Sequence, residues 1–145
     1  MRIKTFSVFL LLLSLSCEPQ LVDDPIPFVP FDDLEANLNL PEYFGLRTTG
    51  GHVAINSIGV RGVIAYRLSA TEIIAYERNC SYQPASSCAT VGVHSSGLFL
   101  EDACCNSNFN FSDGLPSGGP AWRPLRQYFT ELNGSILTIT DEIEF

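Results

Sequence analysis

The chain has little positive charge and almost no lysine. Its 145 residues include 8 Lys and Arg against 16 Asp and Glu, which gives a formal net charge of −8 at pH 7. Lys4 is the only lysine. Beyond residue 16 every cation is an arginine: Arg47, Arg61, Arg67, Arg78, Arg123 and Arg126. Proteins that bind DNA or RNA need clustered cations to displace the counterions of the phosphates. The composition therefore excludes nucleic acid as a partner.

Imidazole is scarce too, and the sequence contains no recognisable catalytic arrangement. His52 and His94 are the only histidines, and we expect both to be strand or loop residues with hydrogen-bonded rings. No serine nucleophile stands in the order that a catalytic triad would need. Glu101 and Asp102 are adjacent, and we interpret them as a solvated loop face rather than an acid and base pair. The sequence therefore predicts that the protein is not an enzyme.

The N-terminal segment has the pattern of a secretory signal. Arg2 and Lys4 precede an apolar run at residues 6–15 that is interrupted only by serines and is too short to span a bilayer as a mature helix. A small residue then stands directly before Cys17, which resembles a bacterial lipobox. We expect residues 1–16 to be a lipoprotein signal peptide and an acylated Cys17 to anchor the protein in a lipid membrane. The alternative is an ordinary signal peptide with a chance cysteine.

These signals predict a location in the cell envelope and a simple division of the mature chain. Glu18 follows the lipidated cysteine, where an aspartate is associated with inner-membrane retention, so the outer membrane is favoured. Residues 18–31 are rich in proline and aspartate, and we expect residues 17–41 to form a lipidated tether whose distal end packs on the domain as an edge segment. Residues 42–145 are short enough for one domain.

Short apolar runs separated by turn residues predict that this domain is all-β. Only residues 32–40 could form a short helical turn, which Pro41 would end. We expect Gly62 to form a bulge within its run. Many short strands with closely spaced turns are typical of β-sandwiches and barrels. The expected strand runs cover residues 52–56, 60–68, 73–78, 98–100, 109–111 and 135–140.

The most specific motif of the chain lies in two cysteine-containing segments and the residues that follow them. Residues 80–82 read C-S-Y, residues 102–109 read D-A-C-C-N-S-N-F, and residues 114–125 read G-L-P-S-G-G-P-A-W-R-P-L. In order and spacing they resemble the C-x-H, C-x-C-H-G-S-x-F and G-x-x-x-x-G-P-A-x-x-P-L motifs of the Rieske-type [2Fe-2S] domain family. The resemblance implies a Rieske-like fold of small antiparallel sheets, with two loops that meet at one tip.

The same resemblance implies that the cluster site is degenerate. A Rieske centre has two thiolates on one iron and two imidazoles on the other. Here the imidazole positions read Tyr82 and Cys105, and the thiolate positions read Cys80 and Asp102. Phenolate and carboxylate oxygens are unusual ligands for such clusters. We therefore expect no cofactor and no metal, and a binding or structural module whose partner would be another envelope protein.

The resemblance also implies how the four cysteines of the domain pair. Respiratory members of the family carry a disulfide between the two loops, and Cys88 and Cys104 match its positions. Cys80 and Cys105 then stand at former ligand positions on facing sides of an empty site, where a second disulfide could close the gap. An even number of cysteines in an exported domain favours disulfides over free thiols. We expect both pairs, Cys88–Cys104 and Cys80–Cys105.

Three alternatives stay open at this point. The chain could be a Rieske-type electron-transfer protein that holds a [2Fe-2S] cluster with altered ligands. It could be a thiol–disulfide switch, for which the adjacent Cys104 and Cys105 are the only support. A zinc site that includes His94 is the third, although the spacing matches no structural zinc pattern.

Overall fold

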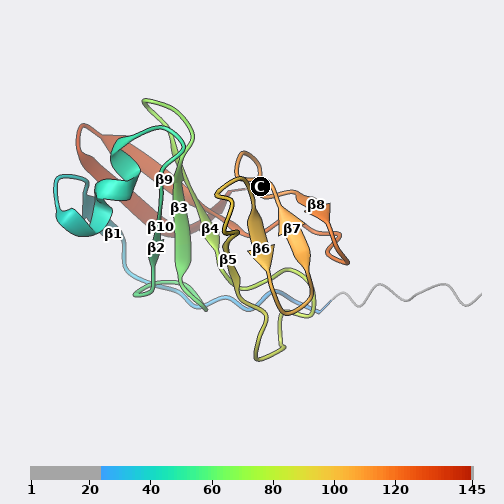
Figure 1. Cartoon of the computed structure of the whole chain (residues 1–145). Helices are drawn as coiled ribbons and strands as arrows, with labels where there is room; N and C mark the ends of the chain where they lie inside the picture. Colours follow the sequence, from blue (N-terminus) through green and yellow to red (C-terminus); the bar gives the residue numbers. More distant parts are fainter. Residues whose placement is uncertain (1–23, 145) are drawn as a thin grey trace, which may run out of the picture.

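The computed structural model describes residues 24–144, so the expected signal peptide and Cys17 lie outside the described residues (Figure 1). No helix among the described residues is long and apolar enough to cross a membrane. In chain order the elements are β1 (Leu34–Asn37), the 3₁₀ helix η1 (Pro41–Arg47), β2 (His52–Ile55), β3 (Val63–Arg67), β4 (Ile73–Glu77), β5 (Val91–Val93), β6 (Leu100–Asp102), β7 (Ser107–Phe109), β8 (Pro116–Gly118), β9 (Gln127–Asn133) and β10 (Ile136–Glu144).

The strands form two antiparallel sheets, which confirms the predicted all-β class. The six-stranded sheet, here called the base sheet, has the order β1-β10-β9-β4-β3-β2. The four-stranded sheet, here called the tip sheet, has the order β5-β6-β7-β8. All strand pairs are antiparallel. In Figure 1 the tip sheet, yellow to orange, lies beside the green strands β3 and β4. The chain therefore leaves the base sheet after β4, builds the tip sheet, and returns to the base sheet in β9.

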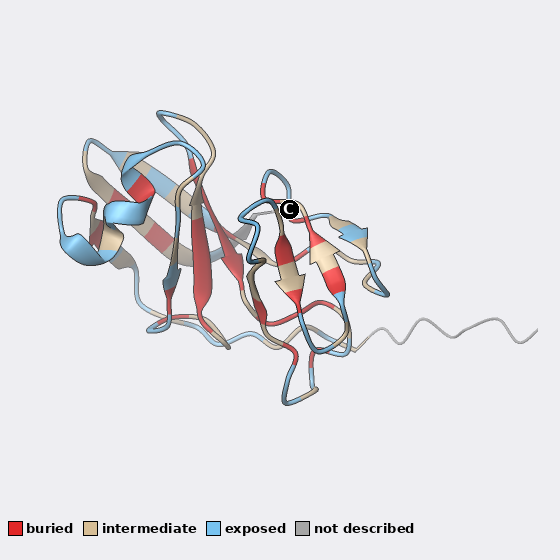
Figure 2. Cartoon of the chain, in the orientation of Figure 1, coloured by how far each residue is buried: buried red, intermediate tan, exposed pale blue. Residues whose placement is uncertain are grey.

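The middle of the base sheet is buried on both faces. Along β4, Ile73 and Ala75 belong to one hydrophobic core, while Ile74 and Tyr76 belong to the other. All five residues of β4 are buried (Figure 2). Successive side chains of a strand point to opposite faces, so a strand with two covered faces reads as an unbroken apolar run. This explains why the sequence runs through β3 and β4 are apolar rather than alternating.

The structure corrects two expectations about local structure. Residues 32–40 do not form a helical turn, because β1 pairs with β10 at the edge of the base sheet. Pro41 begins η1 instead of ending a helix. A proline suits the first helical turn, where its missing N–H has no intrahelical partner to bond. Gly62 has a φ of 87° and lies just before β3, so it forms the turn into the strand rather than a bulge within it.

The distal part of the tether packs on the base sheet. The ring of Phe31 lies edge-on to Tyr128, with their centroids 5.2 Å apart. The guanidinium of Arg126 donates a hydrogen bond of 2.8 Å to the carbonyl oxygen of Ile26. These contacts fix residues 26–31 against the domain, so the chain enters β1 from a defined direction.

Candidate functional site: a thiol and carboxylate group at the tip

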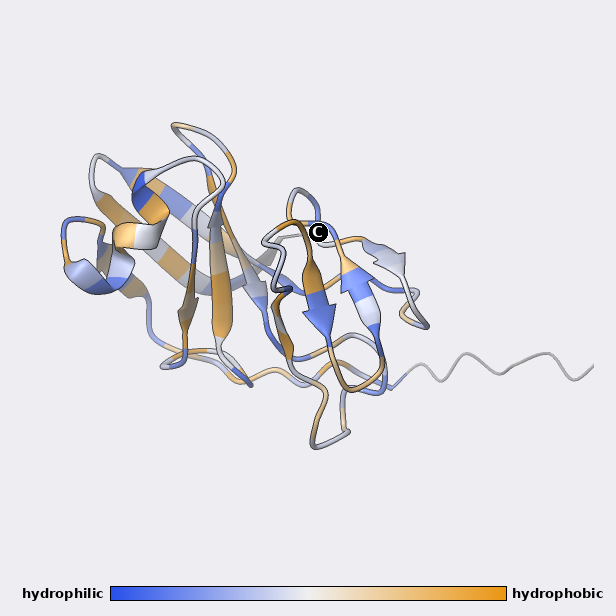
Figure 3. Ribbon diagram, in the orientation of Figure 1, coloured by the Kyte–Doolittle hydropathy of each residue, from blue (hydrophilic) through white to orange (hydrophobic). Residues whose placement is uncertain are grey.

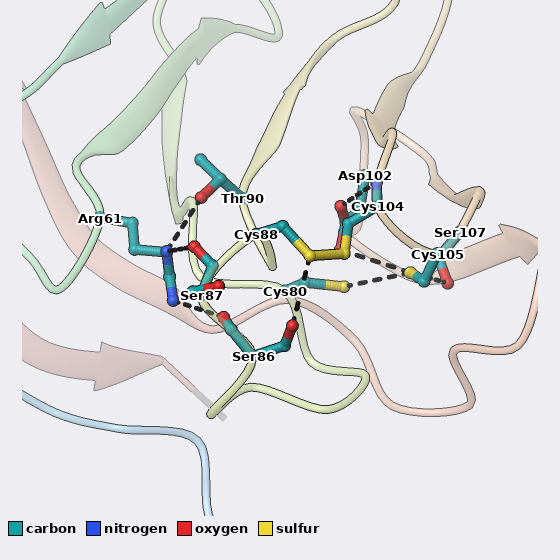
Figure 4. The surroundings of a disulfide bond; sticks show 10 residues. All are labelled: Arg61, Cys80, Ser86, Ser87, Cys88, Thr90, Asp102, Cys104, Cys105 and Ser107. Carbon is teal, nitrogen blue, oxygen red and sulfur yellow. Dashed lines mark hydrogen bonds between the residues drawn. A yellow bond between two sulfur atoms is a disulfide. The ribbon is translucent and has the colours of Figure 1, made fainter.

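Two loops carry the four described cysteines and meet at the end of the tip sheet. Cys80 and Cys88 lie between β4 and β5, and Cys104 and Cys105 lie between β6 and β7 (Figure 4). A disulfide joins Cys88 to Cys104, whose Cα atoms lie 5.7 Å apart. That separation is within the range that a disulfide requires. This bond is the one that the Rieske resemblance implies, and it ties the two loops together.

Cys80 and Cys105 are free thiols in the structure. Their Sγ atoms lie 4.0 Å apart, whereas a disulfide has an S–S length of about 2.05 Å. The second expected disulfide is therefore not formed in this structure, and the pairing stays a prediction. The two sulfur atoms nevertheless come from different loops and face each other, as the resemblance implied.

Asp102 is the third member of the group, and its burial corrects the expectation of a solvated loop face. It is only 1% exposed. Its Oδ1 accepts a hydrogen bond of 2.8 Å from the backbone N–H of Cys104, and its Oδ2 accepts one of 3.3 Å from the Cys105 thiol. Neighbouring side chains of a strand point to opposite faces. Glu101 therefore points away from the site and is partly exposed.

Polar groups around the two thiols complete the site. Ser107 is fully buried, and its Oγ lies 3.0 Å from the sulfur of Cys105. The backbone N–H of Ala121 donates a hydrogen bond of 3.1 Å to the same Oγ. At the other thiol, the backbone N–H of Tyr82 donates to the sulfur of Cys80 over 3.5 Å. Each of the two sulfur atoms therefore has a hydrogen-bonding partner outside the group of Cys80, Asp102 and Cys105.

The environment of Cys80 favours the neutral thiol. Burial raises the pKa of Cys80 well above its ordinary value, and the neighbouring carboxylate of Asp102 raises the pKa further. Thiolates rather than thiols are the reactive species. With the site free of any cation, Cys80 is therefore a poor nucleophile.

The other residues that the sequence singled out lie elsewhere or play packing roles. Tyr82 packs against the core of the tip, and its hydroxyl accepts a weak hydrogen bond of 3.5 Å from the side chain of Gln83. His94 hydrogen-bonds Ser96 over 2.8 Å and stacks on Phe99. Neither His52 nor His94 belongs to the group that Cys80, Asp102 and Cys105 form among the described residues. The geometry therefore gives no support to a zinc site that includes His94.

The donor set does not fit a [2Fe-2S] centre. By the family motif, Cys80 and Cys105 stand at positions that belong to different irons. A separation of 4.0 Å between their sulfur atoms leaves no room for a two-iron core between them. The remaining grouped donor is a carboxylate, whereas thiolate and imidazole are the ligands that such clusters use. As these side chains lie, they are arranged around a smaller volume than a cluster needs.

A buried polar network that no sequence motif indicated holds the first loop. Glu77 is fully buried and accepts hydrogen bonds from the backbone N–H groups of Arg61 and Asn79, at 3.0 and 2.8 Å. The guanidinium of Arg61 donates to the carbonyl oxygens of Ser86 and Ser87, at 2.6 and 2.8 Å (Figure 4). The sequence signal for this network is Glu77 itself, which ends an otherwise apolar strand. A buried carboxylate needs several hydrogen-bond donors, so such a glutamate indicates a polar network around it.

Comparisons with known proteins bear on the fold. No protein-family model matches the chain, and no curated protein matches it. Among solved structures, the chain is similar to one described as the complex of reduced oxygenase and oxidized ferredoxin in carbazole 1,9a-dioxygenase, with a TM-score of 0.50 and 19% identity over 68% of this chain and 87% of that one.

Two further ferredoxins also align with the chain. The ferredoxin of Sphingomonas yanoikuyae B1 has a TM-score of 0.46 and 14% identity over 64% of this chain and 87% of that one. The ferredoxin of carbazole 1,9a-dioxygenase from Nocardioides aromaticivorans IC177 has a TM-score of 0.45 and 19% identity over 66% of this chain and 88% of that one. The likeness to the first of these structures, with its TM-score of 0.50, concerns the fold, and the chain has a Rieske-like fold.

Proposed function

We propose that the protein is an exported lipoprotein whose Rieske-like domain has lost its [2Fe-2S] cluster and acts as a non-catalytic binding or structural module at the cell envelope. The observation that carries this proposal is the donor set at the tip. A carboxylate and a second thiol stand at cluster-ligand positions, and the two thiols lie 4.0 Å apart. A fold can host unrelated functions, so the residues of the site weigh more than the fold itself.

The way in which the tether is held supports a membrane-anchored module. The guanidinium of Arg123 donates hydrogen bonds to the carbonyl oxygens of Asp24 and Ser81, at 2.7 and 2.9 Å. Ser81 belongs to the first cysteine loop, so the tether is fixed beside the tip. A chain extends by at most about 3.6 Å per residue. With the lipid on Cys17, the tip would therefore lie within about 25 Å of the membrane surface.

An exposed aromatic side chain beside the same loop supports a partner-binding role. Trp122 is 42% exposed, and the guanidinium of Arg123 lies 5.1 Å from the centre of its ring. Tryptophan and arginine are enriched among the residues that dominate binding energy at protein interfaces. A structural neighbour is a ferredoxin in complex with its oxygenase. The partner proposed for this chain is a protein of the envelope that contacts the tip.

The loss of the cluster is tested by iron analysis and electron paramagnetic resonance. Protein purified without oxygen should be colourless, contain no acid-labile sulfide, and give no rhombic signal after reduction with dithionite. The triple change Tyr82→His, Asp102→Cys and Cys105→His rebuilds a full Rieske ligand set with Cys80. After reconstitution with iron and sulfide and reduction with dithionite, this variant should show the rhombic signal of a Rieske centre. A rhombic signal from the unmodified protein would overturn the proposal, and electron transfer through a cluster with altered ligands would replace it.

The anchor is tested separately. Replacing Cys17 by Ser removes the thiol that lipidation requires. In detergent partitioning, the protein should therefore move from the detergent phase to the aqueous phase. Unchanged membrane partitioning of this variant would contradict the anchor without bearing on the state of the tip.

A further inference from the structure

We infer that Cys80, Asp102 and Cys105 form a binding site for a single thiophilic divalent cation, with Zn²⁺ as the expected ion. Two thiolates and one carboxylate oxygen would be the protein ligands, and water would take the fourth position. The proposed function requires no metal ion, so this site is an addition to it. The site does not depend on whether Cys17 is lipidated.

The positions of the three donor atoms match one tetrahedral ion. With a Zn–S distance of about 2.3 Å and a Zn–O distance of about 2.1 Å, two sulfur ligands lie about 3.8 Å apart and a sulfur and an oxygen about 3.6 Å apart. The sulfur atoms of Cys80 and Cys105 are 4.0 Å apart, and Oδ2 of Asp102 is 3.3 Å from the sulfur of Cys105. All three donor atoms lie within 4.8 Å of one another. One ion can therefore contact all three after small movements.

The chemistry of the donors selects the class of cation. Sulfur ligands favour Zn²⁺ and similar soft or borderline ions, whereas Mg²⁺ and Ca²⁺ bind to sites made of oxygen alone. When the ion binds, the thiols of Cys80 and Cys105 each lose a proton to solvent and each sulfur forms a bond to the metal. Two thiolates, one carboxylate and Zn²⁺ together carry a charge of −1. The cation thus removes most of the cost of burying three acidic groups side by side.

Neighbouring groups hold the donors in orientations that suit a metal ion. The backbone N–H of Cys104 donates a hydrogen bond to Oδ1 of Asp102, so Oδ2 is the oxygen that faces Cys105. The Oγ of Ser107 accepts from the backbone N–H of Ala121, so its own proton is free to point at a thiolate on Cys105. Groups that hydrogen-bond metal ligands in this way fix their orientation and tune their affinity.

The disulfide contributes to the same arrangement. Cys88 and Cys104 join the two loops, and Cys104 is the direct neighbour of Cys105. The loop that carries Cys80 and the loop that carries Cys105 are therefore held together before any ion arrives. A site whose ligands are held in place loses less conformational entropy when it binds.

The test is a titration of the purified protein with Zn²⁺ in the presence of a competing chelator, after the free thiols have been counted. The unmodified protein should bind one equivalent. Cys80→Ser and Cys105→Ser should each lower the affinity at least about 100-fold, and Asp102→Asn about 10- to 100-fold. Glu101→Gln is the matched control, since it removes a neighbouring carboxylate that points away from the site, and it should bind like the unmodified protein.

A second measurement needs no variant and so does not depend on how the substitutions fold. One equivalent of Zn²⁺ should protect the partly exposed Cys105 from alkylation by iodoacetamide, as seen by peptide mass spectrometry. Co²⁺ should give the visible absorption of a tetrahedral ion together with a thiolate charge-transfer band.

Three results would overturn the site: no saturable binding at one equivalent, no protection of the Cys105 thiol, or a Cys80–Cys105 disulfide in protein isolated from the envelope. A colourless protein that fails to bind Zn²⁺ would remove the site and leave the proposed function standing. A [2Fe-2S] signal from the unmodified protein would remove both.

Discussion

The base sheet and the tip sheet are stabilised by different interactions. Strands β3 and β4 of the base are five residues long and contribute apolar residues to cores on both faces of the sheet, and the nine-residue β10 contributes to one of these cores. Figure 3 colours most of β3 as hydrophobic. Each strand of the tip has only three residues. Such short strands bury little apolar surface by themselves. The base therefore owes its stability to burial, whereas the tip strands pack Val91, Leu100 and Phe109 on a core that they share with the base and are held in addition by a disulfide and by hydrogen bonds from charged side chains.

The two regions are joined by one buried carboxylate. Glu77 ends β4 in the base, and its Oε2 accepts hydrogen bonds of 2.9 Å from the Tyr128 hydroxyl and 2.7 Å from the backbone N–H of Val60. Its Oε1 accepts from the backbone of Arg61, whose guanidinium holds the first cysteine loop. The base thus positions the tip through hydrogen bonds to a charge, and those bonds are stronger than neutral ones.

The largest expected effect comes from breaking this junction. Glu77→Ala should lower the free energy of unfolding by more than about 3 kcal/mol, because several donors lose a charged acceptor at once. Glu77→Gln keeps the shape and one acceptor oxygen, so its loss should be smaller. Urea unfolding measured by circular dichroism checks both changes. Equal stability of the unmodified protein and Glu77→Ala would contradict the view that this residue joins the two regions.

The second-largest expected loss of stability comes from two changes, one in the tip and one in the base. Replacing Cys88 and Cys104 together by alanine removes a link across a sequence separation of 16, which should cost about 3 kcal/mol on the chain-entropy model. Leu137→Ala in the core of the base should cost about the same, at 2 to 5 kcal/mol. The two changes should differ in where hydrogen exchange accelerates.

Amide exchange mapped by mass spectrometry distinguishes these outcomes. Loss of the disulfide should accelerate exchange in the tip loops and leave β3 and β4 protected, because one of the two cores contains no residue of the tip strands. Leu137→Ala should accelerate exchange throughout the domain. If both variants exchange alike, the base and the tip unfold as one unit, and the contrast between them does not extend to stability.

The contrast explains only part of what could be predicted from the sequence, because β1 and β9 of the base sheet also lie outside the expected strand runs. Strands β2, β3, β4 and β10 are covered by runs with clear apolar or alternating patterns. Strand β5 is a three-residue strand, and a pattern of period two needs more residues than that to be recognised. Residues 98–100 were expected to form a strand, yet Leu98 is 78% exposed and β6 begins only at Leu100. The tip strands are defined by the strands with which they pair, rather than by a local hydrophobic pattern in the sequence.

The residues of the candidate site could be predicted from the sequence, whereas their arrangement in space could not. The motif placed Cys80, Asp102 and Cys105 at one tip, and the structure brings these three together. The burial of Asp102 could not be read from the sequence, because it depends on which face of a three-residue strand meets the core. The separation of the two thiols depends on how the loops fold over each other, and residue types alone do not specify it.

The smallest expected effect is a difference in how the two regions respond to alkaline pH. In the tip, burial and then Asp102 raise the pKa of Cys80. In the base, burial and then the charge of Glu77 raise the pKa of Tyr128. When the protein unfolds, these groups return to ordinary pKa values of about 8.5 for a thiol and about 10 for a phenol. Above those values the unfolded state gives up protons that the folded state keeps.

Raised pKa values in the folded state mean that stability is fully present below pH 8 and falls as the pH rises. The decline should begin near pH 8.5 through Cys80 and steepen above pH 10 through Tyr128, by at most about 1.4 kcal/mol per pH unit for each group. Urea unfolding between pH 7 and pH 10.5, with a chelator present, measures both steps. Cys80→Ala should abolish the first step and Tyr128→Phe the second. If Cys80→Ala keeps the decline between pH 8.5 and pH 9.5, some group other than this thiol makes the tip sensitive to alkali.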